Sequence, residues 1–369
     1  MPIIFTRYLY IKDEVEIALT TSILEKKDEA IFWAYELYYS GYEKETFDIL
    51  WKIYHYFFAT LNPCFETYFI KKHQEWMKRT AAELDFYVSV IVNNLIIRPF
   101  NLDVFLLHKI NTHLEFEEED QEPADFNTLL NKSSFVEIAK YVLTSPADQY
   151  STIMEKTVDH FMPEKKLKCM KEWEKIRKCR ETNEIAVILI SRIMMFYSSK
   201  KMPKGKSFYV IVEPEDTIMY ETIAPDKKSY SPYKVLPMAC LYSIDKYHYL
   251  SLFTIARKYE AKPMLCYFDQ WLYYATYSPV WENRVKTFHG TIHHERKQVV
   301  FLNEEQEESF YDNYGYEPDE QKIATQHKNM QPLKQERSWN TLFQTHKANG
   351  LFQDEDGLVE CLEEIKLFE

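Results

Sequence analysis

Asp28–Gly41, with the sequence DEAIFWAYELYYSG, is the stretch that decides the fold. Its apolar side chains recur at helical spacing, so that Ile31, Ala34, Leu37 and Tyr38 share one face. Asp28 is a residue type that begins helices, and Gly41 is one that ends them. The stretch therefore predicts an amphipathic helix that packs its apolar face against neighbours.

The surrounding residues repeat this pattern. Pro63 and Pro99 separate the later helices, because proline interrupts the helical hydrogen-bond ladder. Short connections favour antiparallel neighbours, so residues 1–114 are predicted to form an aromatic-rich helical bundle or short array. The helices predicted here cover residues 13–24, 28–41, 43–60, 65–80, 82–97 and 102–113.

Residues 115–126 are an acidic run that predicts a linker, because adjacent carboxylates repel one another. Residues 127–302 are predicted to form a helical to α+β domain, and 303–369 an acidic, helical C-terminal segment. The predicted helices are 135–143, 148–161, 164–180, 184–197, 249–259 and 263–277, with strands at 207–212, 217–223 and 298–302. The fold class is thus mainly α, with a smaller α+β part.

Ile185–Tyr197 is the most apolar stretch of the chain, and it contains Arg192. It is shorter than the roughly 20 apolar residues that a membrane span requires. We therefore expect a buried helix and no membrane span.

The chain has only six glycines, where average usage would give about 26. None of them has the spacing of a dinucleotide or phosphate-binding loop, which excludes the nucleotide enzymes that are recognisable from sequence. The six cysteines are scattered, and with no secretory signal they are expected to be reduced thiols in an intracellular compartment. No catalytic triad is recognisable, so we expect no cofactor, and an enzyme of unrecognised type is kept as an alternative.

His289 and His293 raise the question of a metal site, because alternate residues of a strand share a face. His248 or Cys266 would have to join them in space. A solvated hairpin with incidental histidines is the favoured interpretation, and no metal site is predicted.

The charge is uneven along the chain, whose formal net charge is -12. Residues 164–206 are strongly basic, and the lysines of the first helix in this region share one face. That face is either an ordinary solvated one or a surface that binds nucleic-acid phosphates. The candidate anion surface comprises Lys168, Lys171, Lys175, Lys178, Lys200, Lys201, Lys204 and Lys206. Leu167, Met170, Trp173 and Ile176 are expected on the opposite, apolar side.

Residues 303–320 combine carboxylates with aromatic side chains and contain no lysine or arginine. One interpretation is a solvated helix that uses its aromatic side chains to dock on the core. The other is a surface that meets a basic partner, since aromatic residues are enriched at interfaces. The candidate partner surface comprises Glu304, Glu307, Glu308, Phe310, Tyr311, Tyr314 and Tyr316.

Four segments together resemble an uncharacterised protein family of the nucleocytoplasmic large DNA viruses. They are FTRYLY at 5–10, FWAYELYYSG at 32–41, YYATYSPVWENR at 273–284 and YGYEPDEQ at 314–321. The family has no assigned activity, so the resemblance implies only context: a viral product in host cytoplasm, viral factories or the virion.

The expected function is therefore a non-enzymatic viral interaction or structural protein, with other viral proteins as partners. A nucleic-acid-associated factor in viral transcription or replication is the alternative. The sequence predicts no oligomeric state.

Overall fold

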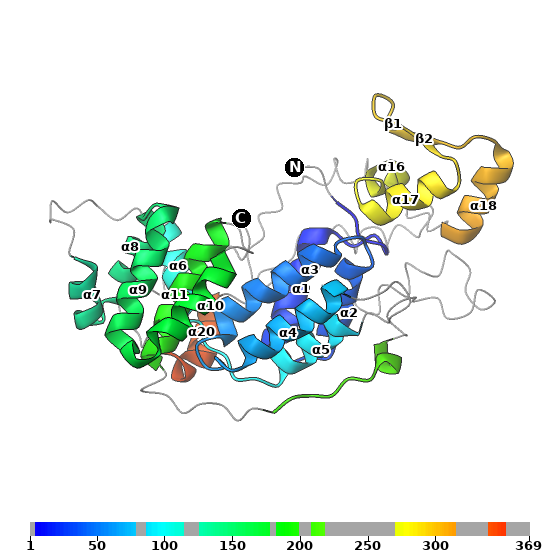
Figure 1. The fold of residues 1–369 in the computed structure, drawn as a ribbon. Helices are drawn as coiled ribbons and strands as arrows, with labels where there is room; N and C mark the ends of the chain where they lie inside the picture. The colour runs from blue at the N-terminus through cyan, green and yellow to red at the C-terminus, as the bar shows by residue number, and fades with distance from the viewer. Residues whose placement is uncertain are drawn as a thin grey trace.

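The computed structural model describes residues 4–78, 86–113, 125–177, 182–198, 208–217, 270–314 and 339–351. Helices account for 73% of these residues, and the strands among them form one two-stranded sheet. The predicted mainly α fold with a small α+β part is confirmed (Figure 1). Apolar side chains gather in three clusters, which we call the first, second and third cluster in chain order.

The first cluster is built around α5, which packs against the four helices that precede it. Most of α5 is buried because its sequence, YVSVIVNNLI, is apolar on nearly every side. The predicted helices are present, but the one expected over 43–60 changes after Ile53 into a π-helical turn, η1, at Tyr54–Phe58. The helices are α1 Lys12–Leu24, α2 Glu29–Tyr38, α3 Glu43–Ile53, α4 Phe65–Lys78 and α5 Tyr87–Ile96.

The second cluster surrounds α11, which packs against α6, α8, α9 and η1. Helix α6 is shared, because Phe105 and Leu106 belong to the first cluster while Val104 and Leu107 belong to the second. The helices are α6 Asp103–His113, α7 Phe126–Lys132, α8 Phe135–Thr144, α9 Tyr150–Phe161, α10 Lys166–Arg177 and α11 Thr182–Ser198. Short 3-10 turns, Ala147–Gln149 and Pro163–Lys165, precede α9 and α10.

Helix α7 was not predicted, because it begins at the end of the acidic run. The carboxylate of Asp125 accepts a hydrogen bond from the Asn127 N–H at 3.2 Å, which caps the helix. Phe126, Leu129 and Leu130 are buried in the second cluster. The remainder of the predicted linker lies outside the described residues.

The third cluster is the small α+β part. Its strands form an antiparallel hairpin that pairs Thr291 with Val300 and His293 with Gln298. The strand expected at 298–302 is therefore present at 298–300. The elements are α16 Trp271–Ala275, α17 Pro279–Thr287, β1 Thr291–His293, β2 Gln298–Val300 and α18 Glu304–Tyr314.

The hairpin predicted from 207 to 223 is wrong in its described part. The residues from Phe208 to Glu213 form no strand, and Pro214–Thr217 is a 3-10 turn, η4. The side-chain amide of Asn94 takes the place of a neighbouring strand: its Oδ1 accepts from the Val210 N–H at 2.9 Å, and its Nδ2 donates to the Val210 carbonyl at 3.1 Å. The backbone of Val210 therefore hydrogen-bonds to a helix side chain and not to a neighbouring strand.

Helix α11 is the apolar stretch expected to be buried, and it is buried. Among the described residues, no helix is long and apolar enough to cross a membrane. The predicted helix at 249–259 and most of the second predicted strand lie outside the described residues, and the predicted domain boundaries stay predictions.

Helix α20, Trp339–His346, and the 3-10 turn η7, Lys347–Asn349, return to the N-terminal half of the molecule. The buried side chains of α20 belong to the first cluster. In Figure 1, α20 lies where the blue and green bundles meet.

Candidate functional site

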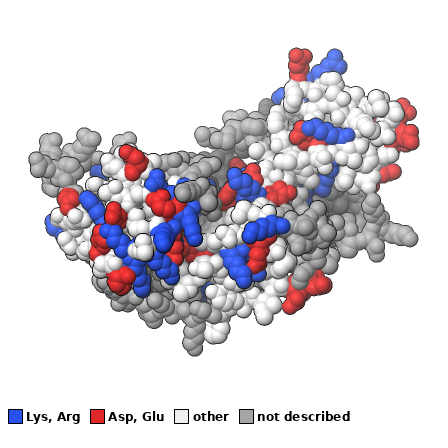
Figure 2. Space-filling view, viewed as in Figure 1, with Lys and Arg blue, Asp and Glu red and all other residues white. Residues whose placement is uncertain are grey.

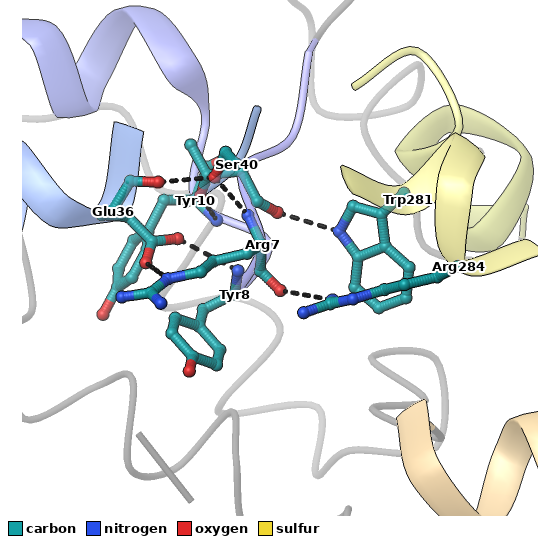
Figure 3. Close-up of polar contacts among 8 residues, drawn as sticks. Arg7, Tyr8, Tyr10, Glu36, Ser40, Trp281 and Arg284 are labelled. Atoms are coloured by element: carbon teal, nitrogen blue, oxygen red, sulfur yellow. Dashed lines mark hydrogen bonds and ion pairs between the residues drawn. The ribbon is translucent and has the colours of Figure 1, made fainter. Parts of the chain in front are cut away.

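The N-terminal turn around Arg7 is fixed to α2 by a buried polar cluster (Figure 3). The Arg7 guanidinium donates to the Glu36 carboxylate at 3.0 Å, and the Tyr8 N–H donates to its other oxygen at 3.0 Å. The Arg7 N–H donates to the Ser40 hydroxyl at 2.8 Å. Both charged side chains are almost completely buried, so the turn is rigidly placed on the helix.

The third cluster is fixed to the same turn by its backbone. The Trp281 indole N–H donates to the Thr6 carbonyl at 3.0 Å, and the Arg284 guanidinium donates to the Arg7 carbonyl at 3.2 Å. Figure 3 shows these two side chains reaching from α17 to the turn. The Arg284 guanidinium also lies 4.5 Å from the centroids of both the Trp281 and Tyr314 rings. We call this set of contacts the N-terminal latch.

Gly41 lets α17 approach α2 closely. Its φ of 89° is in the region that favours glycine, and a Cβ there would lie 2.6 Å from Pro279 Cβ. The Val280 N–H donates to the Ser40 carbonyl at 3.3 Å beside it. The helix end predicted from Gly41 is therefore also a contact point between distant segments.

The latch joins the four segments that carry the resemblance. Arg7 comes from the first, Glu36 from the second, Trp281 from the third and Tyr314 from the fourth. The rest of the fourth segment, including Tyr316, lies outside the described residues. Residues that look unrelated along the sequence thus form one structural unit.

The chemistry of the latch is that of a structural contact. Burial raises the pKa of the Glu36 carboxyl, and the positive charge of Arg7 opposes that shift. Both carboxylate oxygens accept hydrogen bonds, and the Arg7 guanidinium lies near the rings of Tyr8 and Tyr39. A general acid or base needs an atom that reaches a substrate, and the two oxygens of Glu36 are enclosed.

A second buried ion pair fastens the first cluster to the second. Arg192 of α11 donates to the carboxylate of Glu66 on α4. Burial raises the pKa of Glu66, which Arg192 counteracts, and burial also raises the pKa of the neighbouring Tyr54 phenol. The Tyr54 hydroxyl donates to the Asn62 carbonyl at 3.2 Å. The charge inside the apolar α11 segment therefore bridges two bundles.

The predicted basic surface is described only in part. Lys168, Lys171 and Lys175 are exposed on α10, while Lys178, Lys200, Lys201, Lys204 and Lys206 lie outside the described residues. Lys168 lies 3.9 Å from Glu172, and the neighbouring Lys166 pairs with Glu155 and Asp159 at 2.8 Å. Figure 2 shows Lys and Arg interspersed with Asp and Glu over this bundle.

The apolar side of α10 differs from the expectation at one position. Trp173 is buried, and Met170 and Ile176 pack against the second cluster as predicted. Leu167 is 72% exposed, because it lies near the start of the helix, outside the packed face.

Helix α18 carries the residues of the predicted acidic surface, with the aromatic residues on its packed side and the carboxylates on its exposed side. Phe310 is fully buried, with its ring centroid 4.9 Å from that of Phe301, and Tyr311 and Tyr314 pack against the same cluster. The carboxylates of Glu304, Glu307 and Glu308 point outward, as do those of Glu305 and Asp312. None of these five forms an ion pair with a described Lys or Arg. The aromatic residues thus hold the helix, and the carboxylates form its exposed face.

The histidines considered for a metal site lie on or beside the hairpin. His293 is in β1, and the His294 ring nitrogen lies 3.4 Å from the Tyr273 hydroxyl. Tyr273 also shares a hydrogen bond of 2.9 Å with the Tyr277 hydroxyl, which raises the pKa of Tyr273 to about 12. The described residues contain no group of three or more His, Cys, Asp or Glu side chains that would hold a metal ion. His248 and Cys266 lie outside them.

The comparisons with known proteins give no relative: no family model, curated protein or solved structure matches the chain.

One of the contacts that were not predicted did have a signal in the sequence. Arg192 stood out as a charge inside an apolar helix, which requires a buried partner. Arg7 and Glu36 lie in two of the segments that carry the resemblance, although nothing in their spacing indicates that they pair. Asp103, whose carboxylate oxygens lie 3.1 Å from the Leu351 N–H, had no distinguishing signal at all.

Proposed function

We propose that this protein is a non-enzymatic viral interaction or structural protein that acts through protein–protein contacts. The viral context rests on the resemblance of the four segments alone. Host cytoplasm, viral factories and the virion are the places where such a protein would act, and other viral proteins are its proposed partners.

The outward face of α18 is the observation that carries this proposal. Phe310, Tyr311 and Tyr314 anchor the helix, so the carboxylates are presented on a firm support. Glu305, Glu308 and Asp312 project most directly away from Phe310, at 100° per residue. Like charges held this close repel one another, and a basic partner would relieve that repulsion while steering the encounter.

The buried charges of the latch and of the Glu66–Arg192 pair also support the proposal. Each joins segments that are far apart in sequence, and in each the carboxylate is enclosed by its protein partner. Such contacts are suited to holding a scaffold in one shape.

A tagged pull-down from infected cells, read by mass spectrometry with and without nuclease, tests the proposal. The triple variant Glu305→Gln/Glu308→Gln/Asp312→Asn should lose partners that the wild-type protein retains after nuclease treatment. The matched control is Glu137→Gln/Asp148→Asn/Glu164→Gln, which removes three exposed carboxylates from the helices and turns around the second cluster.

Equal recovery of all partners by the two triple variants would contradict an α18 interface. Partners that are lost only on nuclease treatment would favour the alternative function. Lys168, Lys171 and Lys175 would then be the described residues to neutralise, and binding should weaken as salt rises.

A further inference from the structure

Helix α20 packs its apolar face against aromatic side chains of η1 and α6, and we call the surface that receives it the groove. Trp339 is 1% exposed, and its ring centroid lies 4.2 Å from that of Phe105 and 6.1 Å from that of Phe57. Leu342 and Phe343 are buried in the same cluster. These anchors lie at i, i+3 and i+4, the spacing by which a helix fills an apolar groove.

The π-helical turn η1 shapes one wall of this groove. A π-helical turn contains more residues than an α-helical turn, and such turns are frequent at functional sites. Phe57 and Phe58 are both buried in this turn, and the Phe57 carbonyl accepts from the Asn101 N–H at 3.0 Å. The turn thereby connects directly to the start of α6, which forms the other wall.

Polar contacts fix the chain that follows the helix. The Leu351 N–H lies 3.1 Å from both carboxylate oxygens of Asp103, and Asn101 Nδ2 donates to the Asn349 carbonyl at 3.5 Å. A Cβ at Gly350 would lie 2.5 Å from an Asp103 oxygen, so a side chain there would displace that carboxylate. The groove therefore recognises both an apolar helix face and the backbone beyond it.

The groove and its occupant come from opposite ends of the sequence. The groove consists of η1 and residues 100–106, whereas the helix begins at Trp339. Residues 315–338 connect α18 to it, and a segment of that length reaches at most about 80 Å. A helix of eight residues is not stable alone in water, so α20 depends on the groove for its structure.

We propose that this groove also binds the α20 segment of a second copy of the chain, so that two copies exchange their C-terminal segments. The inference rests on the proposed function and names a partner for it, which is the chain itself. A second copy offers the same Trp339, Leu342, Phe343 and Gly350, so an exchanged segment remakes every contact of the intramolecular one. Exchange of an identical element is a low-cost route to dimers.

The segment of the same chain competes with that of a second copy, because tethering gives it a millimolar effective concentration. Exchange is therefore favoured where the protein is concentrated or where one copy has lost its own anchors. The second condition can be created by mutation, and it provides the test.

The first experiment measures fluorescence anisotropy of a labelled peptide, SWNTLFQTHKANGL, which is residues 338–351. The full-length variant Trp339→Ala/Phe343→Ala should bind it at least tenfold more tightly than the wild-type protein, whose groove is filled. Full-length Thr341→Ala/Thr345→Ala, altered on the exposed side of α20, should behave as the wild type does. A peptide with both anchors changed to alanine should not bind.

The second experiment tests exchange between copies. A tagged Trp339→Ala/Phe343→Ala chain should capture untagged wild-type chain as a one-to-one complex in native mass spectrometry. It should not capture an untagged copy of the same variant, which lacks both aromatic anchors. Absence of peptide binding by the folded variant overturns the groove as a separate site, and peptide binding without capture of wild-type chain overturns exchange.

Circular dichroism shows whether the double variant folds. If the double variant does not fold, the full-length variant Leu342→Ala replaces it, because it retains both aromatic anchors. This variant should still bind the peptide more tightly than the wild-type protein does. Equal affinity of the two proteins for the peptide overturns the proposal. The α18 variants are independent of this groove. Loss of exchange with α18 partners intact would refute only the second-copy inference.

Discussion

The third cluster and α20 both pack against the N-terminal bundle from far along the chain, but hydrogen bonds contribute more to the first contact and apolar burial more to the second. The third cluster is held by hydrogen bonds from an indole and a guanidinium to backbone carbonyls at the N-terminal latch, and by burial of Tyr8 among its own apolar side chains. Helix α20 is held mainly by three apolar anchors. Directional hydrogen bonds specify one orientation, whereas burial of apolar area supplies most of the free energy of docking. The latch is therefore suited to a permanent joint, and the groove to a contact that can be remade.

The largest expected effect breaks the latch. Glu36→Gln keeps the shape of the side chain but leaves the buried Arg7 guanidinium without a counter-charge. Loss of one partner of a buried pair costs about 3–5 kcal/mol, so urea unfolding followed by circular dichroism should show a loss of that size. The control Glu29→Gln, on the same helix, should change stability by less than about 0.5 kcal/mol. Similar urea midpoints for the Glu36→Gln and Glu29→Gln variants would show that the charge of Glu36 contributes nothing to stability.

Trp339→Ala tests how strongly the apolar anchors hold α20. Removing a buried tryptophan costs about 3–5 kcal/mol in a core that must unfold as a whole. Helix α20 can instead detach locally, so the global loss should be at most about 3 kcal/mol. Hydrogen exchange should rise across 339–346 while α2 stays protected. If α1 and α2 lose protection to the same extent, α20 is an inseparable part of the bundle.

A smaller effect is expected at the point where α2 meets α17. Gly41→Ala introduces a side chain at a φ of 89° and places it against Pro279. Strain of this kind costs about 1–3 kcal/mol, measurable as a shift of the urea midpoint. When Pro279 is also changed to glycine, the clash with the Pro279 side chain is removed but the unfavourable φ angle at residue 41 remains. The loss of stability caused by Gly41→Ala should therefore be smaller in the Pro279→Gly background, but not zero. An unchanged cost would assign all of it to the backbone angle.

The sequence predicted the helices better than their partners. Periodic apolar residues made α2 and most other helices recognisable, because a helix must bury one face wherever it packs. The predicted strand at 207–212 failed because β-propensity describes a half-buried surface, and Asn94 supplied that surface from a helix. Helix α7 was missed because seven residues with three buried apolar side chains are too short a pattern to distinguish a helix from a loop.

The candidate site was less predictable than the fold for the same reason. The latch depends on pairs such as Thr6 with Trp281, and no local pattern encodes a contact across such a separation. The spacing of the aromatic residues of α18 left two interpretations open, docking on the core or contact with a partner. Only the packing of Phe310 shows which side of α18 is turned inward.

The smallest expected effect is a dependence of α20 docking on pH. Burial against Phe100 and the positive charge of Lys26 lower the pKa of His346 below its usual value of 6.5. A free segment therefore takes up a proton near pH 6.5, while the docked segment does not. Docking is strongest above that pH and weakens as pH falls toward the lower, docked pKa, by at most about tenfold per pH unit.

Anisotropy of the 338–351 peptide with the Trp339→Ala/Phe343→Ala chain should therefore show weaker binding at pH 5.5 than at pH 7.5. A peptide carrying His346→Asn has no imidazole to titrate, and its affinity should be nearly constant over that range. If both peptides lose affinity equally, the groove itself titrates and His346 is not the cause. A loss confined to the histidine peptide would assign the pH dependence of α20 docking to His346.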